Sequence, residues 1–395
     1  MKVLALLPSQ PFPPVNGQTQ RLAHVVQALA ARHDVWLGCF TTALQGPMAP
    51  AARAPFRAVC EVPEGAVDGA LIARLHRRVL AREPYDVARF RSPAMAAFVA
   101  AVLRDVRPDI ILIGDPALTQ YVPPGGPPAV LDYVCEVLLQ IERMRDRAGL
   151  PDRWLWEGRR RVNLRHLQSI AGAYGAVFLN SREDVASIAR YWPAERLDFV
   201  PNGLDMDGYP LGLAAPVPGR MIYAGSVLYP PNRDAVAWFA ADILPRIRAA
   251  VPGAELVVTG GHDDTAPQAE GLRYTGRVPD VRVEIAAAAV SVVPLRLGAG
   301  GARFKVIESM ALGTPVVGTA VAVEGLDLVD GADFLAAEGE AAIADACVAL
   351  LTDPGRRAAI SAGGRARIAA DYDWQALFAR IEARMLALAQ ARRAA

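Results

Sequence analysis

The chain has 395 residues, of which 53% are hydrophobic and 21% charged, and its formal net charge is +1. This composition is typical of a globular protein, and the length favours two domains that each bury an apolar core. No run of about 18 uncharged apolar residues occurs, so no transmembrane helix is predicted. The chain is too weakly basic to predict a nucleic-acid partner.

Short apolar runs rich in β-branched residues predict the strands of the first half. The first run, Lys2–Leu7, lacks a following small-residue cleavage site and continues into a proline-rich loop, so it predicts a core strand and not a signal peptide. The other predicted strands of this half are Asp34–Phe40, Asp109–Ile113, Ala129–Asp132, Ala176–Asn180 and Leu197–Val200. Helical spacing between them predicts helices that include Gln18–Arg32 and Ala94–Val106.

The second half repeats the same alternation of strands and helices. Its predicted strands are Met221–Ala224, Glu255–Thr259, Leu272–Thr275, Val290–Pro294 and Thr314–Gly318, with helices that include Asn232–Ala250 and Phe304–Leu312. Most of the apolar runs are continuous, which suits parallel strands covered on both faces. The fold class predicted is therefore α/β, with two Rossmann-like doubly wound domains.

Proline and glycine mark the predicted domain boundary. We expect an N-terminal domain over residues 1–200, a linker over 201–218, a second domain over 219–373 and a C-terminal helix over 374–395 that can pack back on the N-terminal domain.

The two halves of the chain differ in charge. Residues 1–200 carry 24 basic and 19 acidic side chains, a balance of +5, and the remainder carries 18 and 22, a balance of −4. A basic N-terminal half, with Arg74, Arg77 and Arg78 on one helical stretch, suits an anionic partner such as a phosphorylated acceptor or the surface of the inner membrane.

Cysteine and histidine residues show no metal-binding spacing. The four cysteines and five histidines are scattered along the chain, so we predict no metal site, no cofactor and buried free thiols in a reducing, cytoplasmic compartment.

Two loops that follow predicted first strands are candidate ligand sites. Gly17 ends a proline-rich loop and precedes a helix whose free amides attract anions, although the loop can equally serve as a connecting turn. Gly225 and Ser226 follow the first strand of the second domain, where open α/β sheets bind ligands. The alternative for this loop is again a plain connection.

A glycine-rich loop before a helix is the most informative candidate site. Gly300, Gly301 and Ala302 expose backbone amides, and Arg303 and Lys305 place positive charge at a helix start, where the dipole disfavours it. A bound diphosphate resolves that conflict. Lys305 is one of only two lysines in the chain and shares a helix face with Glu308, so the alternative interpretation is a surface ion pair between them.

A segment rich in tryptophan and arginine, Trp154–Arg161, contains the pair Glu157 and Arg160. This pair indicates a helix face and not a catalytic site. The segment fits a solvated helix with a buried aromatic edge, or a contact with a membrane surface.

These motifs together resemble the two-domain Rossmann-type (GT-B) glycosyltransferases, and within them the retaining glycosyltransferase family 4. The resemblance covers nearly the whole chain and looks closest to bacterial exopolysaccharide-type sugar transferases. It rests on the Gly17 loop, Val200–Asp205, Tyr223–Ser226 with Pro231–Ala235, Tyr274–Val281 and Arg303–Val317. It implies two domains that face a central cleft, and transfer of a sugar from a nucleotide-diphosphate-sugar to a glycan, a lipid-linked molecule or a small molecule.

The same resemblance implies roles for individual residues. Glu308 would accept hydrogen bonds from the ribose, and Arg277 and Val278 would lie near the base. Gly225, Ser226, Arg303, Lys305 and the amides of Gly300, Gly301 and Ala302 would hold the diphosphate and sugar, with Gly17 closing over the phosphates. Arg303 and Lys305 would stabilise the leaving diphosphate. Asp115, after the strand Asp109–Ile113, either orients a sugar or only caps a turn.

The chain departs from the family pattern at two places. The family often has a second glutamate eight residues before Glu308, where this chain has Gly300. The family also often has a basic pair near Ser226 and Asn232, where Arg233 is the nearest cation. A sugar-nucleotide-binding protein without turnover, or an epimerase or phosphorylase of the same two-domain plan, therefore stays open as an alternative.

Overall fold

The computed structural model describes residues 1–14, 17–41, 46–64, 83–134, 136–297 and 304–394. The chain divides into two compact units, the first made of Met1–Val200 and the C-terminal segment from Phe378 onward, the second running from Pro201 to Leu377. Each unit has its own hydrophobic core.

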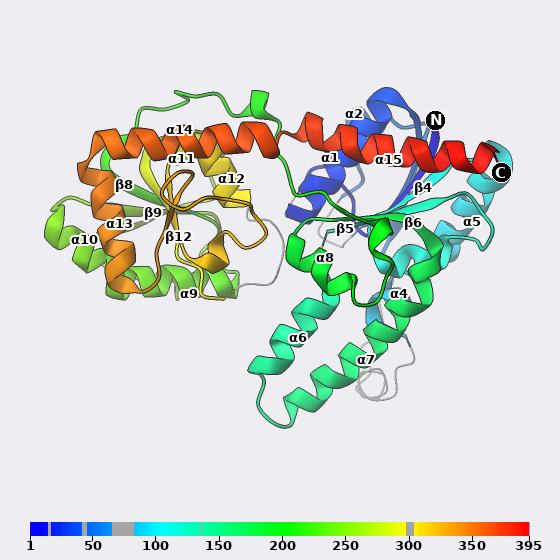
Figure 1. The fold of residues 1–395 in the computed structure, drawn as a ribbon, viewed down its shortest axis with the longest axis horizontal. Coiled ribbons are helices and arrows are strands. Elements are labelled where there is room, and N and C mark those ends of the chain that lie inside the picture. Colours follow the sequence, from blue (N-terminus) through cyan, green and yellow to red (C-terminus); the bar gives the residue numbers. More distant parts are fainter. Residues whose placement is uncertain (15–16, 42–45, 65–82, 135, 298–303, 395) are drawn as a thin grey trace. The chain divides into compact units, whose positions relative to one another are not determined.

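Within the described residues, the first unit is built on a parallel sheet of seven strands in the order β3-β2-β1-β4-β5-β6-β7 (Figure 1). The strands are β1 Lys2–Leu7, β2 Asp34–Thr41, β3 Ala58–Pro63, β4 Ile110–Ile113, β5 Ala129–Tyr133, β6 Tyr174–Leu179 and β7 Leu197–Phe199. The central strands are buried along nearly their whole length, which explains their continuous apolar runs. The strand order reverses between β1 and β4.

Helices connect these strands. Among the described residues, the α-helices of this unit are α1 Gly17–Arg32, α2 Pro50–Arg53, α4 Tyr85–Arg89, α5 Pro93–Ala101, α6 Val137–Arg147, α7 Asp152–Ile170 and α8 Arg182–Ile188. The C-terminal helix α15, Trp374–Ala394, lies beside α1 (Figure 1), where Glu382 accepts hydrogen bonds from Arg32 and pairs with His33, each at 2.8 Å.

Within the described residues, the second unit has a parallel sheet of six strands in the order β10-β9-β8-β11-β12-β13. The strands are β8 Val217–Ala224, β9 Glu255–Thr259, β10 Leu272–Gly276, β11 Ala288–Val293, β12 Val316–Gly318 and β13 Leu335–Ala336. The helices are α9 Pro230–Trp238, α10 Leu244–Ala250, α11 Val281–Ala286, α12 Phe304–Ala311, α13 Glu340–Thr352 and α14 Pro354–Asp371. The order reverses between β8 and β11, so both units have the strand arrangement of a doubly wound α/β domain.

The segment predicted as a linker, 201–218, is part of the second unit. Leu204 and Tyr209 are buried in that unit's core, and β8 already begins at Val217. Leu204 also forms an isolated β-bridge with Asp373, so this part of the segment is held against the chain just before α15.

No helix among the described residues combines the length and the apolar character that crossing a bilayer requires. Cys39 and Cys347 are buried free thiols and Cys60 is half-buried, whereas Cys135 lies outside the described residues.

Candidate functional site

The candidate site lies at the carboxyl end of β8, next to the point where the strand order of the second unit reverses. Ligands of open parallel sheets bind at such points because the loops after the two flanking strands diverge there. Gly225 and Ser226 directly follow β8, and the chain after β11 leads to α12, which begins at Phe304.

Lys305, in the first turn of α12, reaches back to the end of β8. Its Nζ donates hydrogen bonds to the hydroxyl of Tyr223 and to Oδ1 of Asn232, both at 2.9 Å, and lies 4.1 Å from the centroid of the Tyr223 ring. Tyr223 is a fully buried residue of β8, and Asn232 lies in the first turn of α9. The ammonium is therefore held where two helix N-termini and one strand end meet, which concentrates positive potential.

The loop after β8 is shaped around this ammonium. A Cβ atom at Gly225 would stand 3.0 Å from both Lys305 Nζ and Asn232 Nδ2, so a side chain there would press on both groups. Asn232 Nδ2 also donates to the carbonyl of Ser226 at 2.8 Å, and Ser226 Oγ donates to the carbonyl of Gly261 at 2.8 Å. The predicted residues Gly225, Ser226 and Lys305 are thus brought together.

Glu308 lies one turn after Lys305 but makes a different contact. Its Oε1 accepts a hydrogen bond from the Tyr209 hydroxyl at 2.8 Å, and within the described residues Oε2 accepts none. Burial raises the pKa of Glu308, while Tyr209 and the charges of Arg282 and Lys305 oppose that rise. The alternative of a simple surface ion pair does not describe Lys305, whose ammonium bonds to Tyr223 and Asn232.

Other predicted residues of the second unit lie at the same edge of its sheet. Arg277, which is exposed, and Val278, which is half-buried, directly follow β10. The loops after β9 and β10 are joined by a hydrogen bond from Gly260 N to the carbonyl of Gly276 at 2.8 Å. Arg233, the cation nearest to Ser226 and Asn232 in the sequence, forms an ion pair with Asp263: its Nη2 atom donates to both carboxylate oxygens, at 2.7 and 2.8 Å. It is therefore already engaged as a cation.

Two predicted residues belong to the first unit. Gly17 is the first residue of α1, as expected for a loop-to-helix junction. Asp115 follows β4, and its Oδ1 accepts from Ala117 N at 2.8 Å, which caps the short 3₁₀ helix Pro116–Tyr121. Burial raises the pKa of Asp115 to about 7. The capping geometry is the alternative that the sequence had left open for this residue.

Gly300, Gly301, Ala302 and Arg303, which were predicted to contact the diphosphate, lie outside the described residues. So do Arg74, Arg77 and Arg78. Among the described residues, no group of three or more histidine, cysteine, aspartate or glutamate side chains is arranged to hold a metal ion.

Sequence reasoning missed Tyr223, Asn232 and Tyr209 as members of the site. Tyr223 and Asn232 flank the Gly225 loop, so their position at a strand end and a helix start was an available signal. Tyr209 lies in the presumed linker, 99 residues from Glu308, and nothing in the local pattern points to their contact.

Residues 218–353 match a family model described as "Glycosyl transferases group 1". Over 155 residues the chain is 29% identical to a GDP-mannose-dependent monoacylated alpha-(1-6)-phosphatidylinositol monomannoside mannosyltransferase from Corynebacterium glutamicum. This match spans 35% of the present chain and 40% of the relative's length.

Solved structures match the fold over nearly the whole chain. Sucrose-phosphate synthase from Thermosynechococcus elongatus superposes with a TM-score of 0.68 at 18% identity, covering 99% of this chain and 100% of that one. Anabaena HepE in complex with UDP-glucose gives a TM-score of 0.64 at 15% identity, covering 98% and 99%. The chain therefore has the fold of these glycosyltransferase structures, and its residues 218–353 match the model of the group 1 glycosyl transferases.

Proposed function

We propose that the protein transfers a sugar from a nucleotide-diphosphate-sugar to an acceptor, with retention of configuration, as a family 4 enzyme. The observation that carries this proposal is the position of Lys305 Nζ, held by Tyr223 and Asn232 at the carboxyl end of β8. This ammonium lies inside the matched domain and beside Gly225, where a side chain would crowd it.

The chemistry breaks the bond between the anomeric carbon and a diphosphate oxygen. Positive charge develops on the sugar ring and negative charge on the departing diphosphate, so preorganised cations and amides near that diphosphate lower the barrier. In this proposal Lys305, Arg303 and the amides of Gly300, Gly301 and Ala302 stabilise the diphosphate. Because these groups supply the positive charge, the mechanism requires no metal and no cofactor.

The nucleoside part is proposed to lie along the same sheet edge. Glu308 Oε2, which accepts no hydrogen bond within the described residues, can accept from the ribose hydroxyls. Arg277 and Val278, after β10, would contact the base. Gly17 would approach the phosphates and Asp115 would orient a sugar hydroxyl, both from the first unit.

The relatives support the proposed class of donor. The Corynebacterium relative is named as GDP-mannose-dependent, and the HepE structure holds UDP-glucose, which supports a nucleotide-diphosphate-sugar donor here. The acceptor is proposed to be a glycan, a lipid-linked molecule or a small molecule. The protein is proposed to lie in the cytoplasm, with a peripheral contact to the inner membrane.

A panel of nucleotide sugars that includes UDP-glucose and GDP-mannose tests the proposal. A true donor should raise the melting temperature, because it binds the native state alone, and should be consumed with release of its nucleoside diphosphate. If no nucleotide sugar raises the melting temperature, the proposal is wrong.

The sequence favours one rival function. Gly300 replaces a glutamate that the family often carries, so the protein can instead be a sugar-nucleotide-binding protein without turnover. Such a protein would be stabilised by one donor and would release no nucleoside diphosphate with any acceptor.

A further inference from the structure

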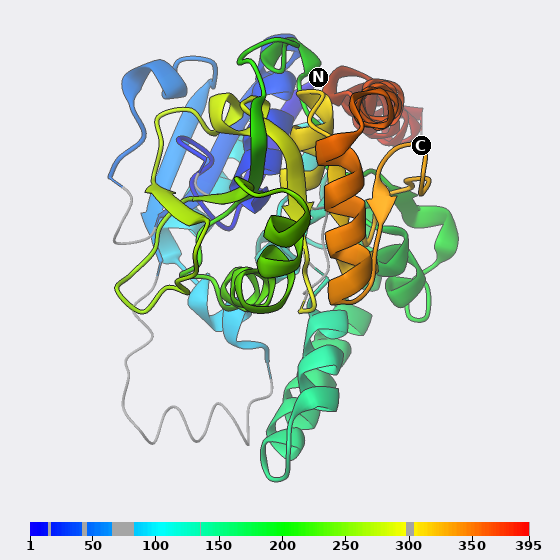
Figure 2. The ribbon, with the colours of Figure 1, turned by 90° about the vertical axis from the view of Figure 1, so that its left-hand side faces the viewer.

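Helices α6 and α7 form a hairpin that extends away from strands β5 and β6 of the first unit (Figures 1 and 2). Residues 148–151 connect the two helices, and α7 has 19 residues. A helix of that length measures about 28 Å, so the end of the hairpin is carried well clear of the sheet.

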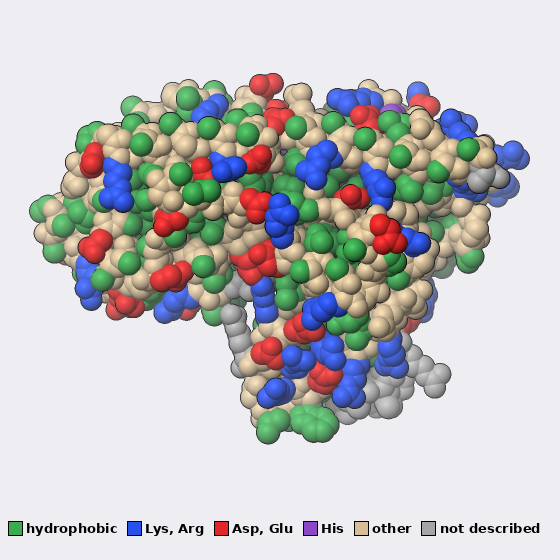
Figure 3. All heavy atoms as spheres, in the orientation of Figure 1, with side chains coloured by type: hydrophobic (Ala, Val, Ile, Leu, Met, Phe, Trp, Pro, Cys, Tyr) green, Lys and Arg blue, Asp and Glu red, His purple; other side chains and the backbone are tan. Residues whose placement is uncertain are grey.

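The tip of this hairpin, which we define as Met144, Leu150, Trp154 and Leu155, exposes large apolar side chains. Trp154 and Leu150 are each 77% exposed, Met144 is 48% and Leu155 36% exposed. Figure 3 shows hydrophobic side chains at the end of the hairpin. Exposed large apolar side chains gathered at one end of a hairpin mark an interaction surface. The expectation that the tryptophan-rich segment has a buried aromatic edge is wrong for Trp154.

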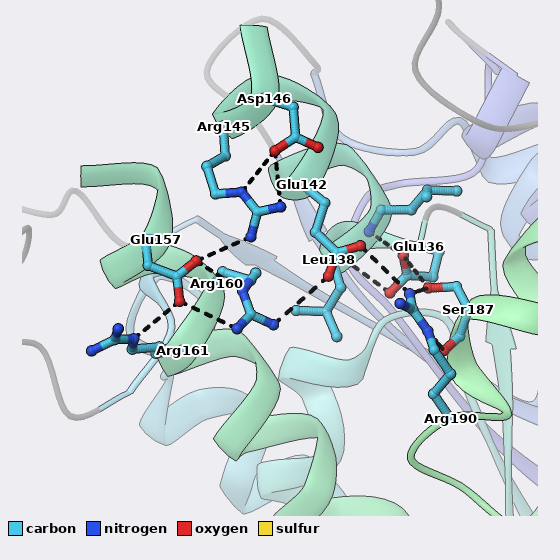
Figure 4. Close-up of polar contacts among 11 residues, drawn as sticks. Glu136, Leu138, Glu142, Arg145, Asp146, Glu157, Arg160, Arg161, Ser187 and Arg190 are labelled. Carbon is cyan, nitrogen blue, oxygen red and sulfur yellow. Dashed lines mark hydrogen bonds and ion pairs between the residues drawn. The ribbon is translucent and has the colours of Figure 1, made fainter. Parts of the chain in front are cut away.

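Ion pairs tie the hairpin together behind its tip (Figure 4). Glu157 accepts hydrogen bonds from Arg145 at 3.1 Å, from Arg160 at 3.0 Å and from Arg161 at 3.0 Å. The contact with Arg145 joins α7 to α6, as does the pair of Glu142 with Arg160, and Glu142 also pairs with Arg190, which follows α8. These ion pairs therefore hold the two helices together behind the tip.

The charge around the tip is positive. Residues 137–170 contain eight arginines and four carboxylates, a balance of +4. Three of the four carboxylates, Glu142, Asp146 and Glu157, are paired with arginines. Arg153 and Arg159 lie on the exposed surface within about two turns of Trp154, so the hairpin carries positive charge close to its apolar tip.

We propose that this hairpin tip docks on the surface of an anionic phospholipid bilayer. Trp154 and Leu150 would enter the headgroup region, where an indole with an apolar body and one N–H group is favoured, and the surrounding arginines would bind headgroup phosphates. Charge complementarity favours an anionic lipid surface, because the hairpin that carries the apolar tip has a charge balance of +4. The inference rests on the peripheral membrane contact of the proposed function and assigns it a surface, but its test does not depend on sugar transfer.

Flotation of the full chain with vesicles tests the proposal. Vesicles of phosphatidylcholine alone are compared with vesicles that also contain phosphatidylglycerol. We expect binding only to the anionic vesicles, weakened by salt. Trp154→Ser should reduce the binding constant on the order of tenfold, because the apolar contact is lost. Each arginine near such a surface contributes roughly fivefold, so Arg153→Glu with Arg159→Glu should reduce binding by at least about 25-fold.

Matched control variants lie in the second unit. Val329 is 51% exposed, so Val329→Ser removes an exposed apolar side chain that is not part of the hairpin. Arg246→Glu with Arg356→Glu makes the same change of net charge at two exposed positions. Both controls should bind vesicles like the parent protein, and unchanged melting curves would show that all variants are folded.

Three outcomes would overturn the proposal. The first is a parent protein that does not float with anionic vesicles at low salt. The second is a pair of hairpin variants that bind as well as their controls. The third is self-association of the parent protein, measured by sedimentation velocity, that is lost in Trp154→Ser while vesicle binding stays unchanged. That result would assign the tip to a contact with a second copy of the chain.

Discussion

The Nζ atom of Lys305 lies 2.9 Å from the hydroxyl of Tyr223 and 4.1 Å from the centroid of its ring. The tyrosine therefore contacts the ammonium with two different groups, its oxygen and its π face. Because a lysine in the first turn of a helix is opposed by the helix dipole, these contacts offset an unfavourable position and fix the ammonium in space.

Replacing Lys305 by alanine should lower kcat about 10²–10³-fold, with a smaller change in donor Kd. The charge on the departing diphosphate is larger in the transition state than in the bound donor, so a cation fixed beside it acts mainly on turnover. Lys305→Arg should restore only part of the rate, since a planar guanidinium does not fit the place of an ammonium. Steady-state rates and calorimetric donor affinities measure the two effects separately.

The other lysine of the chain supplies the control for this experiment. Lys2 Nζ donates to the carbonyl of Val106 at 3.1 Å on the exposed side of the first unit. Lys2→Ala should keep the parent kcat. If Lys305→Ala also turns over at the parent rate, the diphosphate role of Lys305 is excluded.

Removing the hydroxyl of Tyr223 should have a graded effect. In Tyr223→Phe the ring remains under the ammonium, while the hydrogen bonds to Lys305 and to Asn232 are lost. We expect kcat to fall roughly fivefold, as for the loss of about 1 kcal/mol of hydrogen bonding. Tyr372→Phe, which removes a buried hydroxyl that accepts from Asp327 N in the same unit, should lower stability comparably and leave kcat unchanged. Equal rates in the two variants would contradict the role of Tyr223.

Most of the strands were predictable because parallel strands covered on both faces need continuous apolar runs. Strand β3 was not, since Ala58–Pro63 lies at the sheet edge, is mostly half-buried and contains Glu61. Strand β13 has only two residues, too few for any periodicity. The sequence also placed Gly225, Ser226 and Lys305 correctly at strand and helix ends, because the carboxyl-end rule depends on connectivity alone.

The side-chain contacts within the site could not be predicted from sequence patterns. Tyr209 meets Glu308 only because an irregular segment folds over the second unit, and no spacing encodes that path. The exposure of Trp154 likewise depends on tertiary structure that the sequence pattern does not encode. A tryptophan at helical spacing is usually buried, and only the geometry of the hairpin leaves this one uncovered.

Glu308→Ala should weaken donor binding about ten- to hundredfold without unfolding the protein, as expected when a charged acceptor of hydrogen bonds is lost. Glu308→Gln keeps one carbonyl oxygen for Tyr209 and should lose less affinity. Burial raises the pKa of Glu308, which means that the ionised carboxylate is disfavoured where it lies, so the glutamine variant should be at least as stable as the parent near neutral pH. Isothermal titration with the donor decides, and unchanged affinity in both variants would remove the ribose contact.

Glu136 should make the stability of the protein depend on pH. It is 2% exposed, it caps α6 by accepting from Leu138 N and Leu139 N, and burial raises its pKa to about 7. A carboxyl whose pKa is higher in the folded state contributes stability that is complete below its unfolded pKa of 4.5 and is lost as the pH rises through about 7. Relative to the parent, Glu136→Gln should therefore gain roughly 3 kcal/mol of unfolding free energy between pH 4.5 and 8. Urea unfolding across this range measures it, and parallel curves would refute it.

The buried pair of Arg21 and Asp132 should be the most costly ion pair to break in the first unit. Both side chains are fully buried, Arg21 Nε donates to Asp132 Oδ1 at 2.8 Å, and Arg21 Nη1 donates to the carbonyl of Val200 at 2.7 Å. Asp132→Asn leaves a buried guanidinium without its counter-charge, which costs about 3–5 kcal/mol. Glu83→Gln, which breaks the exposed pair with Arg91, should cost less than about 1 kcal/mol. Thermal unfolding compares the two variants. If they melt alike, the buried pair does not hold α1 against β5. If the double variant Arg21→Met with Asp132→Asn regains stability over Asp132→Asn, the loss lies in the uncompensated charge.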